Sequence, residues 1–505
     1  MRSGLKAIPA PDRSNWVEAM RAAFSRASYV EAASIFDSFA GGNPPPEPAL
    51  LRARIHLKHD EYSRVVQLLS ARSMARSADV SQRAMLLAYA YARIGKFSVS
   101  DELFAEAEKG ANDKELRAEV AHYRARRYLH EGKTDEAWAL LPIVREAQSA
   151  ALRLRALFLE SSIYARERRY RDQARLLTEL LEATKPKSGD HIEVRAWATH
   201  TLAALARELP LADAASVVEA QLSGHPWPAD FAVQRFQALK ALGWCRALKG
   251  DYFNAFRFLK RSAEEAVGDA WHAVAACDRA YLARCNNEPL WSRQELAEAE
   301  DYAARVDWHA TQNEERIALL LLAELFAPLD TSRAAYYLAQ YDELGDIKSR
   351  QLHFRDDPRP TAMASYCAGV VHLATGERRL GIDSLRSSLR RFDGIGYDWR
   401  AGRCLLRLYE VTRDNAFLKR AIEKLRHYRQ SWLGDELRAL DTLRSKLPPM
   451  QQKVYDAICR GLSNAAIAEE LGRSEFTIRN HIKLIFRAFG VNSRSQLIAN
   501  SNRPD

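Results

Sequence analysis

A turn signal that recurs between two helical patterns is the feature that most constrains this fold. The segment LLAYAYARIGKFSVSDELFAEAEK, residues 86–109, shows the unit. We expect Leu87, Ala88 and Tyr91 to share one face of a first helix, which Gly95 ends by supplying a positive φ. Phe97 is expected to pack in the turn. Ser100, Phe104 and Ala107 then face back from the second helix, and the small Ala88 and Ser100 allow the two backbones to approach closely.

The same pattern returns along the chain at a nearly constant interval. Equivalent turn positions are Gly132, Arg168, Gly250 and Gly376, which gives intervals of 37, 36, 82 and 126 residues from Gly95 onward. These are close to one, one, two and three periods of roughly 40 residues, the range of helical solenoids. No alternating strand pattern of useful length occurs from about residue 15 to 445, so we expect an all-α fold.

This region resembles the tetratricopeptide repeat family with degenerate copies, over most of residues 15–430. The resemblance implies a curved stack of hairpins whose concave surface binds a peptide, a protein or a small effector, since each hairpin must bury its apolar face on its neighbours. Six aromatic residues fit either a ligand groove on that surface or the core between helices: Trp138, Trp244, Tyr252, Phe256, Trp271 and Trp399.

The segment from residue 447 to 500 has a different organisation, that of four short helices. Proline opens the first helix and Gly461 ends it. Ser463 is expected to cap the second and Ser474 the third, with Gly472 and Arg473 in the turn between them. Two short helices joined by a tight turn that contains glycine are typical of the helix-turn-helix unit, whose second helix enters the DNA major groove.

The third helix is clearly two-faced. Ile478, Ile482, Ile485 and Phe489 recur at steps of 4, 3 and 4 residues and predict a buried stripe. The opposite face carries Phe476, Arg479, Asn480, Lys483 and Arg487. Arginine and lysine can read guanine edges and asparagine can read adenine, whereas Phe476 can either contact a thymine methyl group or pack.

The segment closely resembles the DNA-binding domain of LuxR-type regulators. The matching residues are Gly461-Leu462-Ser463-Asn464, Ile467-Ala468, Ser474-Glu475, Thr477 to Ile482, Gly490-Val491 and Ser493-Arg494-Ser495. The resemblance implies base contacts at Arg479, Asn480 and Lys483. It implies a dimer contact on DNA through the helix of residues 493–500, here with Ser493, Leu497 and Ile498. Backbone contacts to DNA are expected at Ser463, Asn464, Arg473, Ser474, Thr477 and Arg487.

One departure from the family weakens the first helix. The family opens this helix with Thr-Pro-x-Glu, whereas this chain has Pro448-Pro449-Met450-Gln451. The capping hydroxyl is lost and Gln451 can only partly replace the glutamate, at a cost of ~1 kcal/mol.

Charge and composition agree with a DNA partner and favour no enzyme. From Lys419 to the end there are sixteen Lys or Arg and nine Asp or Glu, which is +7 of the net charge of +10. The EGKT at 131–134 lacks the first glycine of a phosphate-binding loop and its strand context. Six scattered cysteines fit free thiols and no zinc pattern. No apolar run reaches the length of a membrane helix, and the N-terminus lacks a secretory pattern.

These observations predict an all-α chain in two parts. Residues 1–440 form a tetratricopeptide-like solenoid for sensing or interaction, and residues 441–505 form a four-helix LuxR-type helix-turn-helix domain. We expect a cytoplasmic bacterial transcription regulator, without cofactor or metal, that binds double-stranded DNA as a homodimer. A protein or small effector on the solenoid controls this binding. The alternative is an interaction scaffold whose C-terminal domain only localises it or docks a partner.

Overall fold

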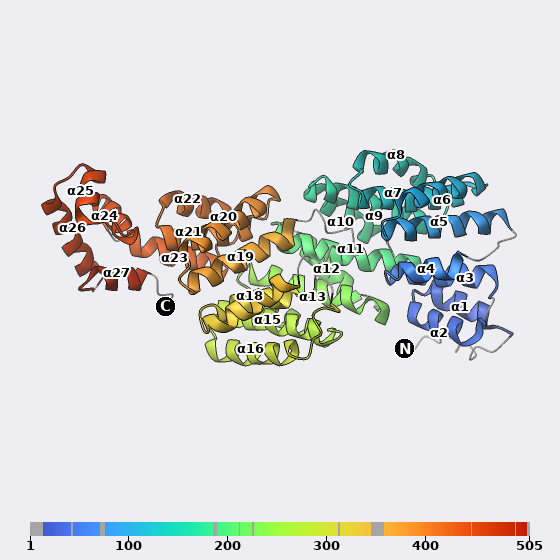
Figure 1. The fold of residues 1–505 in the computed structure, drawn as a ribbon, viewed down its shortest axis with the longest axis horizontal. Helices are drawn as coiled ribbons and strands as arrows, with labels where there is room; N and C mark the ends of the chain where they lie inside the picture. Colours follow the sequence, from blue (N-terminus) through green and yellow to red (C-terminus); the bar gives the residue numbers. More distant parts are fainter. Residues whose placement is uncertain are drawn as a thin grey trace.

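In the computed structural model, the described residues are 14–41, 44–70, 76–184, 189–211, 213–224, 227–311, 314–344, 358–445, 447–489 and 491–501. These segments contain helices and no strand. The chain forms an elongated solenoid with a small helical domain at one end (Figure 1). The all-α solenoid predicted from the recurring turns is thereby confirmed.

Helices adjacent in sequence pack as antiparallel hairpins. In the N-terminal half these are α1 (Trp16–Ser25) with α2 (Tyr29–Phe39), α3 (Pro46–Lys58) with α4 (Tyr62–Leu69), α5 (Ser77–Arg93) with α6 (Phe97–Gly110), α7 (Lys114–His130) with α8 (Thr134–Arg145), α9 (Ala150–Arg166) with α10 (Tyr170–Ala183), and α11 (Gly189–Glu208) with α12 (Ala214–Gly224).

A short 3-10 helix, η1 (Ala229–Phe231), leads into the second half. The hairpins there are α13 (Ala232–Ala247) with α14 (Tyr252–Glu264), α15 (Asp269–Cys285) with α16 (Pro289–Ala303), α17 (Ile317–Phe326) with α18 (Thr331–Glu343), α19 (Pro358–Ala374) with α20 (Arg378–Gly394), and α21 (Asp398–Thr412) with α22 (Asn415–Lys424). The last elements are α23 (Trp432–Ser445), α24 (Pro449–Cys459), α25 (Asn464–Leu471), α26 (Glu475–Ala488) and α27 (Arg494–Ser501).

Most of the turns between the two helices of a hairpin share one geometry. All five predicted turn positions have positive φ, with 83° at Gly95 and 58° at Arg168. The residue after the turn position donates its N–H to the carbonyl five residues earlier, as in the 2.9 Å bond from Lys96 to Tyr91, which satisfies a carbonyl at the helix end. Three further turns place Ala27, Asp60 and Asn287 at φ of 59°, 58° and 56°. The sequence analysis did not identify these three turns, none of which has glycine at this position.

Small residues bring the two helices of a hairpin together, as expected. Ala88 and Ser100 are both fully buried where α5 crosses α6. In α19 and α20 the equivalent pair is Gly369 and Gly381, and a Cβ atom added to either would lie 3.1 Å from the carbonyl oxygen of the other. Phe97, expected to pack in its turn, is instead 36% exposed.

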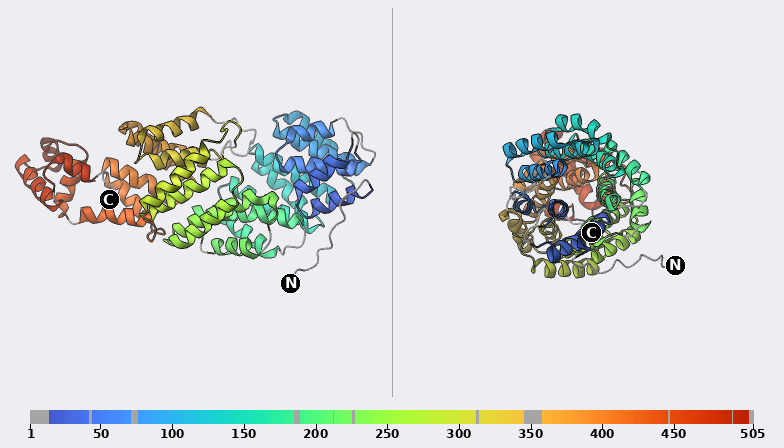
Figure 2. Two further views of the ribbon diagram at one scale, coloured as in Figure 1. Left: turned by 90° about the horizontal axis from the view of Figure 1, so that it is seen from below. Right: turned by 90° about the vertical axis from the view of Figure 1, so that its right-hand side faces the viewer.

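The hairpins wind around the long axis so tightly that successive turns of the superhelix touch. Viewed from the end, they surround that axis (Figure 2). The Tyr29 hydroxyl of α2 donates to Glu193 of α11 at 3.1 Å, across 164 residues. Glu208 of α11 accepts two hydrogen bonds from Arg400 of α21, at 2.7 and 2.8 Å, across 192 residues. The predicted concave surface is therefore the inner wall of a closed superhelix.

The structure shows where the six aromatic residues lie that fit either a core or a ligand groove by their sequence. Trp271 lies in the core of the second half, where its ring centroid is 5.1 Å from that of Phe236. Trp244 and Trp399 are buried in the same core, yet both also line a cavity described below. The other three are packed against hydrophobic cores while partly buried: Trp138, Tyr252 and Phe256. Core packing accounts for most of the set, and two of its members combine both roles.

Helix α23 joins the solenoid to the C-terminal domain. Trp432, Leu433 and Leu437 of this helix belong to the hydrophobic core of the second half, whereas Leu447 belongs to the separate core of the C-terminal domain. The predicted division at residues 440/441 falls within α23 and stays a prediction.

Four further features of the described chain concern the phosphate-loop, disulfide, membrane and metal patterns considered in the sequence. Residues 131–133 lie in the turn between α7 and α8, and Thr134 is the first residue of α8, in the helix–turn–helix context that the sequence indicated. The six cysteines all lie in the described segments, where no disulfide joins any two of them, and five are buried. Within the described segments, no helix is both long and apolar enough to cross a membrane, and no cluster of three His, Cys, Asp or Glu side chains is arranged to hold a metal ion.

Candidate nucleic-acid interface

The unit of α25, turn and α26 is built by local hydrogen bonds that the sequence predicted. The Ser463 hydroxyl caps α25 by accepting the Ala466 N–H at 3.2 Å, and Ser474 caps α26 by accepting the Thr477 N–H at 3.2 Å. Such caps satisfy N–H groups that have no partner within their own helix. Between them Gly472 has a φ of 59° and a left-handed conformation that ends α25. These contacts fix where α26 begins and so which of its side chains face outward.

The buried face of α26 holds it on the rest of the domain. Ile478 and Ile485 are fully buried and Ile482 is 8% exposed, in a core shared with α24, α25 and α27. Phe489 is half-buried and its ring stacks on Tyr455 of α24, with centroids 5.0 Å apart. The predicted stripe is confirmed, with Phe489 at its less buried end.

The opposite face of α26 is open to solvent. Arg479, Asn480, Lys483, Arg487 and Phe476 are all exposed, and we call this row the α26 outer face. Phe476 is 72% exposed, so the alternative in which it packs within the chain is wrong. Arg479 forms an ion pair with Glu475 one turn earlier, at 3.2 Å. Its side chain is 63% exposed, so this pair contributes little stability and is easily exchanged for another anion.

Five of the six residues predicted to contact the DNA backbone lie around the starts of α25 and α26, whereas Arg487 lies near the end of α26. Ser463, Arg473 and Ser474 are exposed, and Asn464 and Thr477 are half-buried. The Thr477 hydroxyl lies 2.9 Å from that of Ser474, so two hydroxyls gather at the N-terminus of α26. A helix N-terminus with free N–H groups favours an anion, and hydroxyls there add donors for phosphate oxygens.

Arg494 has a structural role that the sequence did not suggest. Its guanidinium donates to the Leu462 carbonyl and, at 2.7 Å, to Oδ1 of Asn464, so it fastens α27 to the loop before α25. Burial lowers the pKa of Arg494. Because Oδ1 of Asn464 already accepts this hydrogen bond, the group of Asn464 that can donate to a phosphate is its side-chain NH2.

The predicted dimer helix, α27, is partly committed to the core of the domain. Leu497 is fully buried, so its side chain contacts the other helices of the domain and not a partner. Ser493 and Ile498 are half-buried, and the Ser493 hydroxyl caps α27 by accepting the Gln496 N–H at 3.1 Å. Dimer contact through α27 stays a prediction for the helix, with Leu497 corrected to a core residue. Gly490, matched before this helix, lies outside the described residues.

At the start of the first helix of the domain, the glutamine that bonds back to the preceding chain is not the one that we expected. α24 begins at Pro449 without a side-chain cap. Gln452, and not Gln451, reaches back, and its amide donates to the Leu447 carbonyl at 2.8 Å. This bond ties the entry of the chain to the first turn of α24.

The domain contacts the solenoid through α24, so α26 faces away. Asn415, the first residue of α22, donates its side-chain amide to Oδ2 of the buried Asp456 of α24 at 2.8 Å. Figure 1 shows α26 at the outer end of the molecule. The α26 outer face is therefore free of the remainder of the described chain.

This arrangement suits duplex DNA in charge and in shape. Residues 447–501 contain seven Lys or Arg and four Asp or Glu. Arg479 and Lys483 are donors that match guanine N7 and O6, and the Asn480 amide matches adenine N6 and N7. An exposed α-helix with such a row of side chains fits the width of the major groove.

A match to a known family agrees with this geometry. Residues 445–500 match the family model described as bacterial regulatory proteins, luxR family. No curated protein matches the chain. Among solved structures, the crystal structure of the APC/C hetero-tetramer Cut9–Hcn1 is similar at 13% identity and a TM-score of 0.32, over 98% of this chain and 97% of that chain. The chain thus carries, at residues 445–500, a helix-turn-helix domain of the LuxR family of bacterial regulatory proteins.

Proposed function

We propose that this protein is a sequence-specific DNA-binding transcription regulator. The observation that carries the proposal is the outward-facing row of Arg479, Asn480 and Lys483 on a helix whose isoleucines anchor its other side. A solvated surface helix needs no such combination of a rigid back, two serine caps and a cationic, amide-bearing front.

In the proposed complex, α26 lies in the major groove. Arg479 and Lys483 donate to guanine, Asn480 pairs with adenine, and the exposed ring of Phe476 contacts a thymine methyl group. Arg479 exchanges Glu475 for the base, which costs little because the ion pair is exposed. The hydroxyls of Ser474 and Thr477 contact a phosphate and set the register of α26 on the duplex.

The larger part of the chain acts as the sensor in this proposal. A partner protein or a small effector binds the solenoid, and the protein binds its operator as a homodimer in the bacterial cytoplasm. The signal works only if its ligand has different affinities for the states that are competent and incompetent for DNA binding. Helix α23 is the physical connection, since its first residues belong to the solenoid core.

The test begins with selection of bound sequences from a random duplex pool by the full-length protein. Arg479→Ala and Lys483→Ala should each weaken binding to the selected site by ~1–3 kcal/mol and relax specificity at one base position. Lys453→Ala, which removes an exposed charge from α24 outside the α26 outer face, is the matched control.

Two results would contradict the proposal. One is the failure of the wild-type protein to enrich any sequence from the pool. The other is wild-type affinity and specificity in both α26 variants, which would mean that the outer face does not read the bases.

A further inference from the structure

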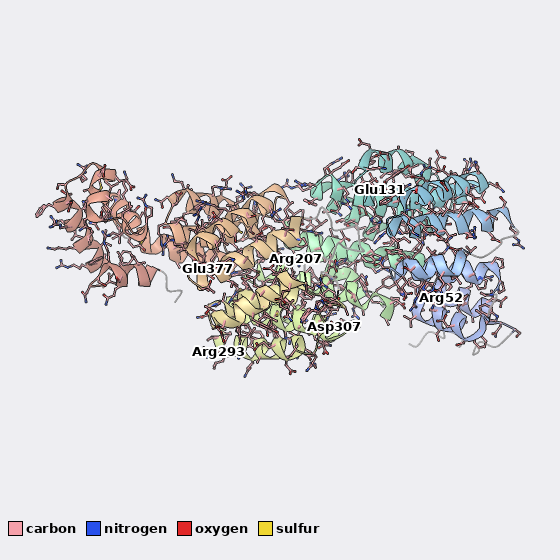
Figure 3. The ribbon with its side chains drawn as sticks, viewed as in Figure 1. Arg52, Glu131, Arg207, Arg293, Asp307 and Glu377 are labelled. Carbon is pink, nitrogen blue, oxygen red and sulfur yellow. The ribbon has the colours of Figure 1, made fainter. Side chains whose placement is uncertain are left out.

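The second turn of the superhelix encloses a cavity that the DNA-binding function does not use. Its wall is formed mainly by the first helices of successive hairpins, α11, α13, α15, α17, α19 and α21. It contains about 730 Å³ of empty space, a figure that includes the part open to solvent. Figure 3 labels Arg207, one of its residues, in the middle of the molecule and Arg293 at the outside.

The wall of this cavity is rich in aromatic rings. Five of its residues are aromatic, drawn from four hairpins: Trp244, Tyr281, Tyr366, Phe392 and Trp399. Ile317, Leu321 and Met363 add aliphatic surface and are only half-buried, because they face the cavity. Such a wall favours a flat apolar body, for which rings provide large contact areas and edge or face interactions.

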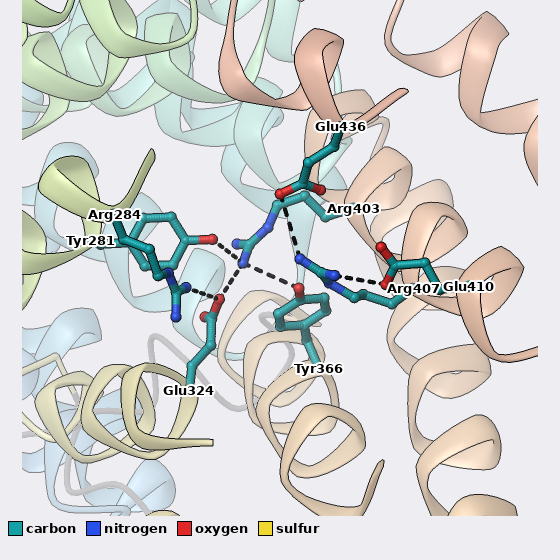
Figure 4. Close-up of polar contacts among 8 residues, drawn as sticks. All are labelled: Tyr281, Arg284, Glu324, Tyr366, Arg403, Arg407, Glu410 and Glu436. Carbon is teal, nitrogen blue, oxygen red and sulfur yellow. Dashed lines mark hydrogen bonds and ion pairs between the residues drawn. The ribbon is translucent and has the colours of Figure 1, made fainter. Parts of the chain in front are cut away.

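Two of the cations in the wall are each held by a carboxylate. Arg400 is held by Glu208 through two hydrogen bonds of 2.7 and 2.8 Å. Arg403 donates to Glu324, to the Tyr281 hydroxyl and, at 3.2 Å, to the Tyr366 hydroxyl, as Figure 4 shows. These residues form a frame in the wall; among the described residues, Nη1 of Arg400 and both Nε and Nη1 of Arg403 form no hydrogen bond.

The frame continues toward α23 through a second set of ion pairs. Arg407 of α21 contacts Glu410 at 2.6 Å and Glu436 of α23 at 3.5 Å (Figure 4). Burial raises the pKa of Glu436, and the charge of Arg407 opposes this effect. The connecting helix is therefore attached to the same helix, α21, that carries Arg400 and Arg403.

Two other cations have unused hydrogen-bonding capacity. Lys240 is 7% exposed, and its ammonium forms no hydrogen bond within the described chain; its nearest carboxylate oxygen, Oδ2 of Asp278, is 3.9 Å away. Arg207 donates only its Nε, to Glu208 at 2.7 Å, among the described residues, which leaves both Nη groups. Oδ2 of Asp278 also lacks a hydrogen-bond partner in this part of the chain, while its Oδ1 accepts from Trp244 at 2.8 Å.

The electrostatics around Lys240 favour binding of an anion. Burial lowers the pKa of Lys240, Asp278 opposes this, and the positive charges of Arg207 and Arg400 lower it further. A buried ammonium normally has close hydrogen-bonded partners. The wall itself carries four cations and two carboxylates: Arg207, Lys240, Arg400, Arg403, Asp278 and Glu324.

We propose that this cavity binds a small aromatic carboxylate. Its carboxylate is held by the ammonium of Lys240 and the Nη groups of Arg207, and its ring lies against Trp244, Trp399 and the aliphatic side chains of α17. A ligand with this charge supplies the acceptors that Lys240 lacks, and its ring fills the apolar part of the cavity.

The cavity adjoins the residue that anchors the connecting helix. Trp432, the first residue of α23, packs on three rings of the cavity wall, with centroids 5.9 Å from Trp244, 6.3 Å from Tyr281 and 6.4 Å from Trp399. A ligand against those rings changes the packing of Trp432 and so the position of the DNA-binding domain. This regulatory clause rests on the proposed function; the binding site itself does not.

Binding is tested on the full-length protein by calorimetric titration and tryptophan fluorescence, because two tryptophans line the site. The probes are benzoate, phenylacetate and indole-3-acetate, each compared with its uncharged amide. We expect saturable one-to-one binding of at least one acid, with affinity about tenfold or more above that of its amide, since hydrogen bonds to a charged partner are the stronger ones.

Two variants test the charge of Lys240 and the volume of the cavity separately. Lys240→Met keeps the apolar stem without the charge and should weaken the acid about tenfold or more, with no equal effect on the amide. Leu321→Trp fills the cavity and should weaken both. Lys260→Met and Leu290→Trp, at exposed positions of α14 and α16, are the controls and should change neither. Circular dichroism and melting curves show whether each variant folds.

Saturable binding of none of the three acids would overturn the proposal. Binding that survives unchanged in both folded Lys240→Met and Leu321→Trp would overturn it as well, since the acid would then sit elsewhere. The DNA arm is separate: a saturating acid should shift the affinity for the selected DNA site in the wild type and not in Trp432→Ala. No shift in the wild type would refute the regulatory clause and leave the cavity assigned.

Discussion

Glu208 joins one turn of the superhelix to the next through Arg400, and neutralising its carboxylate should lower the free energy of unfolding. The carboxylate ends α11 and is 2% exposed. It accepts hydrogen bonds from Arg400, from Trp399 at 3.0 Å and from Arg207 at 2.7 Å. Burial would raise its pKa, but the charges and hydrogen bonds of Arg400 and Arg207 outweigh burial and lower the pKa to about 2.

The size of the effect follows from this pKa. The value falls from an ordinary 4.5 to about 2. A difference of about 2.5 in pKa corresponds to about 3 kcal/mol of stability at neutral pH. Because the folded pKa is the lower one, this stability is complete above about pH 4.5 and is lost as the pH falls toward 2, with about 1.4 kcal/mol left at pH 3. Glu208→Gln imitates the protonated side chain and should lose about 3 kcal/mol at pH 7.

The assay compares denaturant unfolding of the wild type and Glu208→Gln at pH 7 and pH 3. Tryptophan fluorescence follows unfolding, and hydrogen exchange should place the loss in α11 and α21. Glu179→Gln, which removes an exposed carboxylate paired with Arg175 on α10, is the control and should unfold like the wild type. A Glu208→Gln variant as stable as the wild type at pH 7, or a difference that does not shrink at pH 3, would refute the reasoning.

Three further predictions concern the DNA-binding domain and the hairpin turns. Ile482→Ala should destabilise the 447–501 domain by ~2–5 kcal/mol, measured by hydrogen exchange in α24–α27, whereas Leu484→Ala, at a position 47% exposed, should not. Gly132 has a φ of 76° and no atom that would crowd a new Cβ. Gly132→Ala should therefore cost ~1–2 kcal/mol and lower the melting temperature; an unchanged melting temperature would contradict this. Arg487→Ala should reduce the salt slope of DNA binding by about 1, and Arg420→Ala on α22 should not.

The local structure of the DNA-binding domain was predictable because short-range chemistry determines it. A serine three residues before a free N–H, a glycine that adopts positive φ, and isoleucines at steps of 3 and 4 residues each act within one helix. Ser463, Ser474, Gly472 and Ile478 are accordingly placed as predicted. Leu497 was misplaced because an apolar residue on a short terminal helix fits a dimer contact and a core equally well by its sequence.

The turn positions of the solenoid show that the interval between turns can identify positions that the residue type alone does not. Arg168 was identified by its distance from Gly132, although arginine rarely adopts positive φ. Ala27, Asp60 and Asn287 could have been found in the same way, since 33 and 35 residues separate Ala27 from Asp60 and Asp60 from Gly95. A search for glycine alone could not detect them.

The closure of the superhelix and the cavity within it could not be predicted from the sequence. Glu208 and Arg400 are 192 residues apart, and whether they meet depends on the small rotation at each of the intervening hairpins. That rotation is set by how the helices of neighbouring hairpins pack on one another, and a single sequence does not show which residues of two helices meet. Nothing in the sequence sets Lys240 apart, and Trp244 fits a core or a groove equally well by its sequence. The structure places both in the wall of a cavity that α21 also lines.

The uneven charge that first suggested a DNA partner has two different physical origins. Part of it belongs to the end of the solenoid, where Arg420 and Lys424 pair with Asp393 at 2.6 and 3.0 Å and are not available to a polyanion. Arg494, within the C-terminal domain, points inward to hold α27. The argument for DNA therefore rests less on the net charge than on where Lys483 and its neighbours lie. A few cations on one exposed helix, with an amide among them, meet a duplex more specifically than a larger charge spread over the chain end.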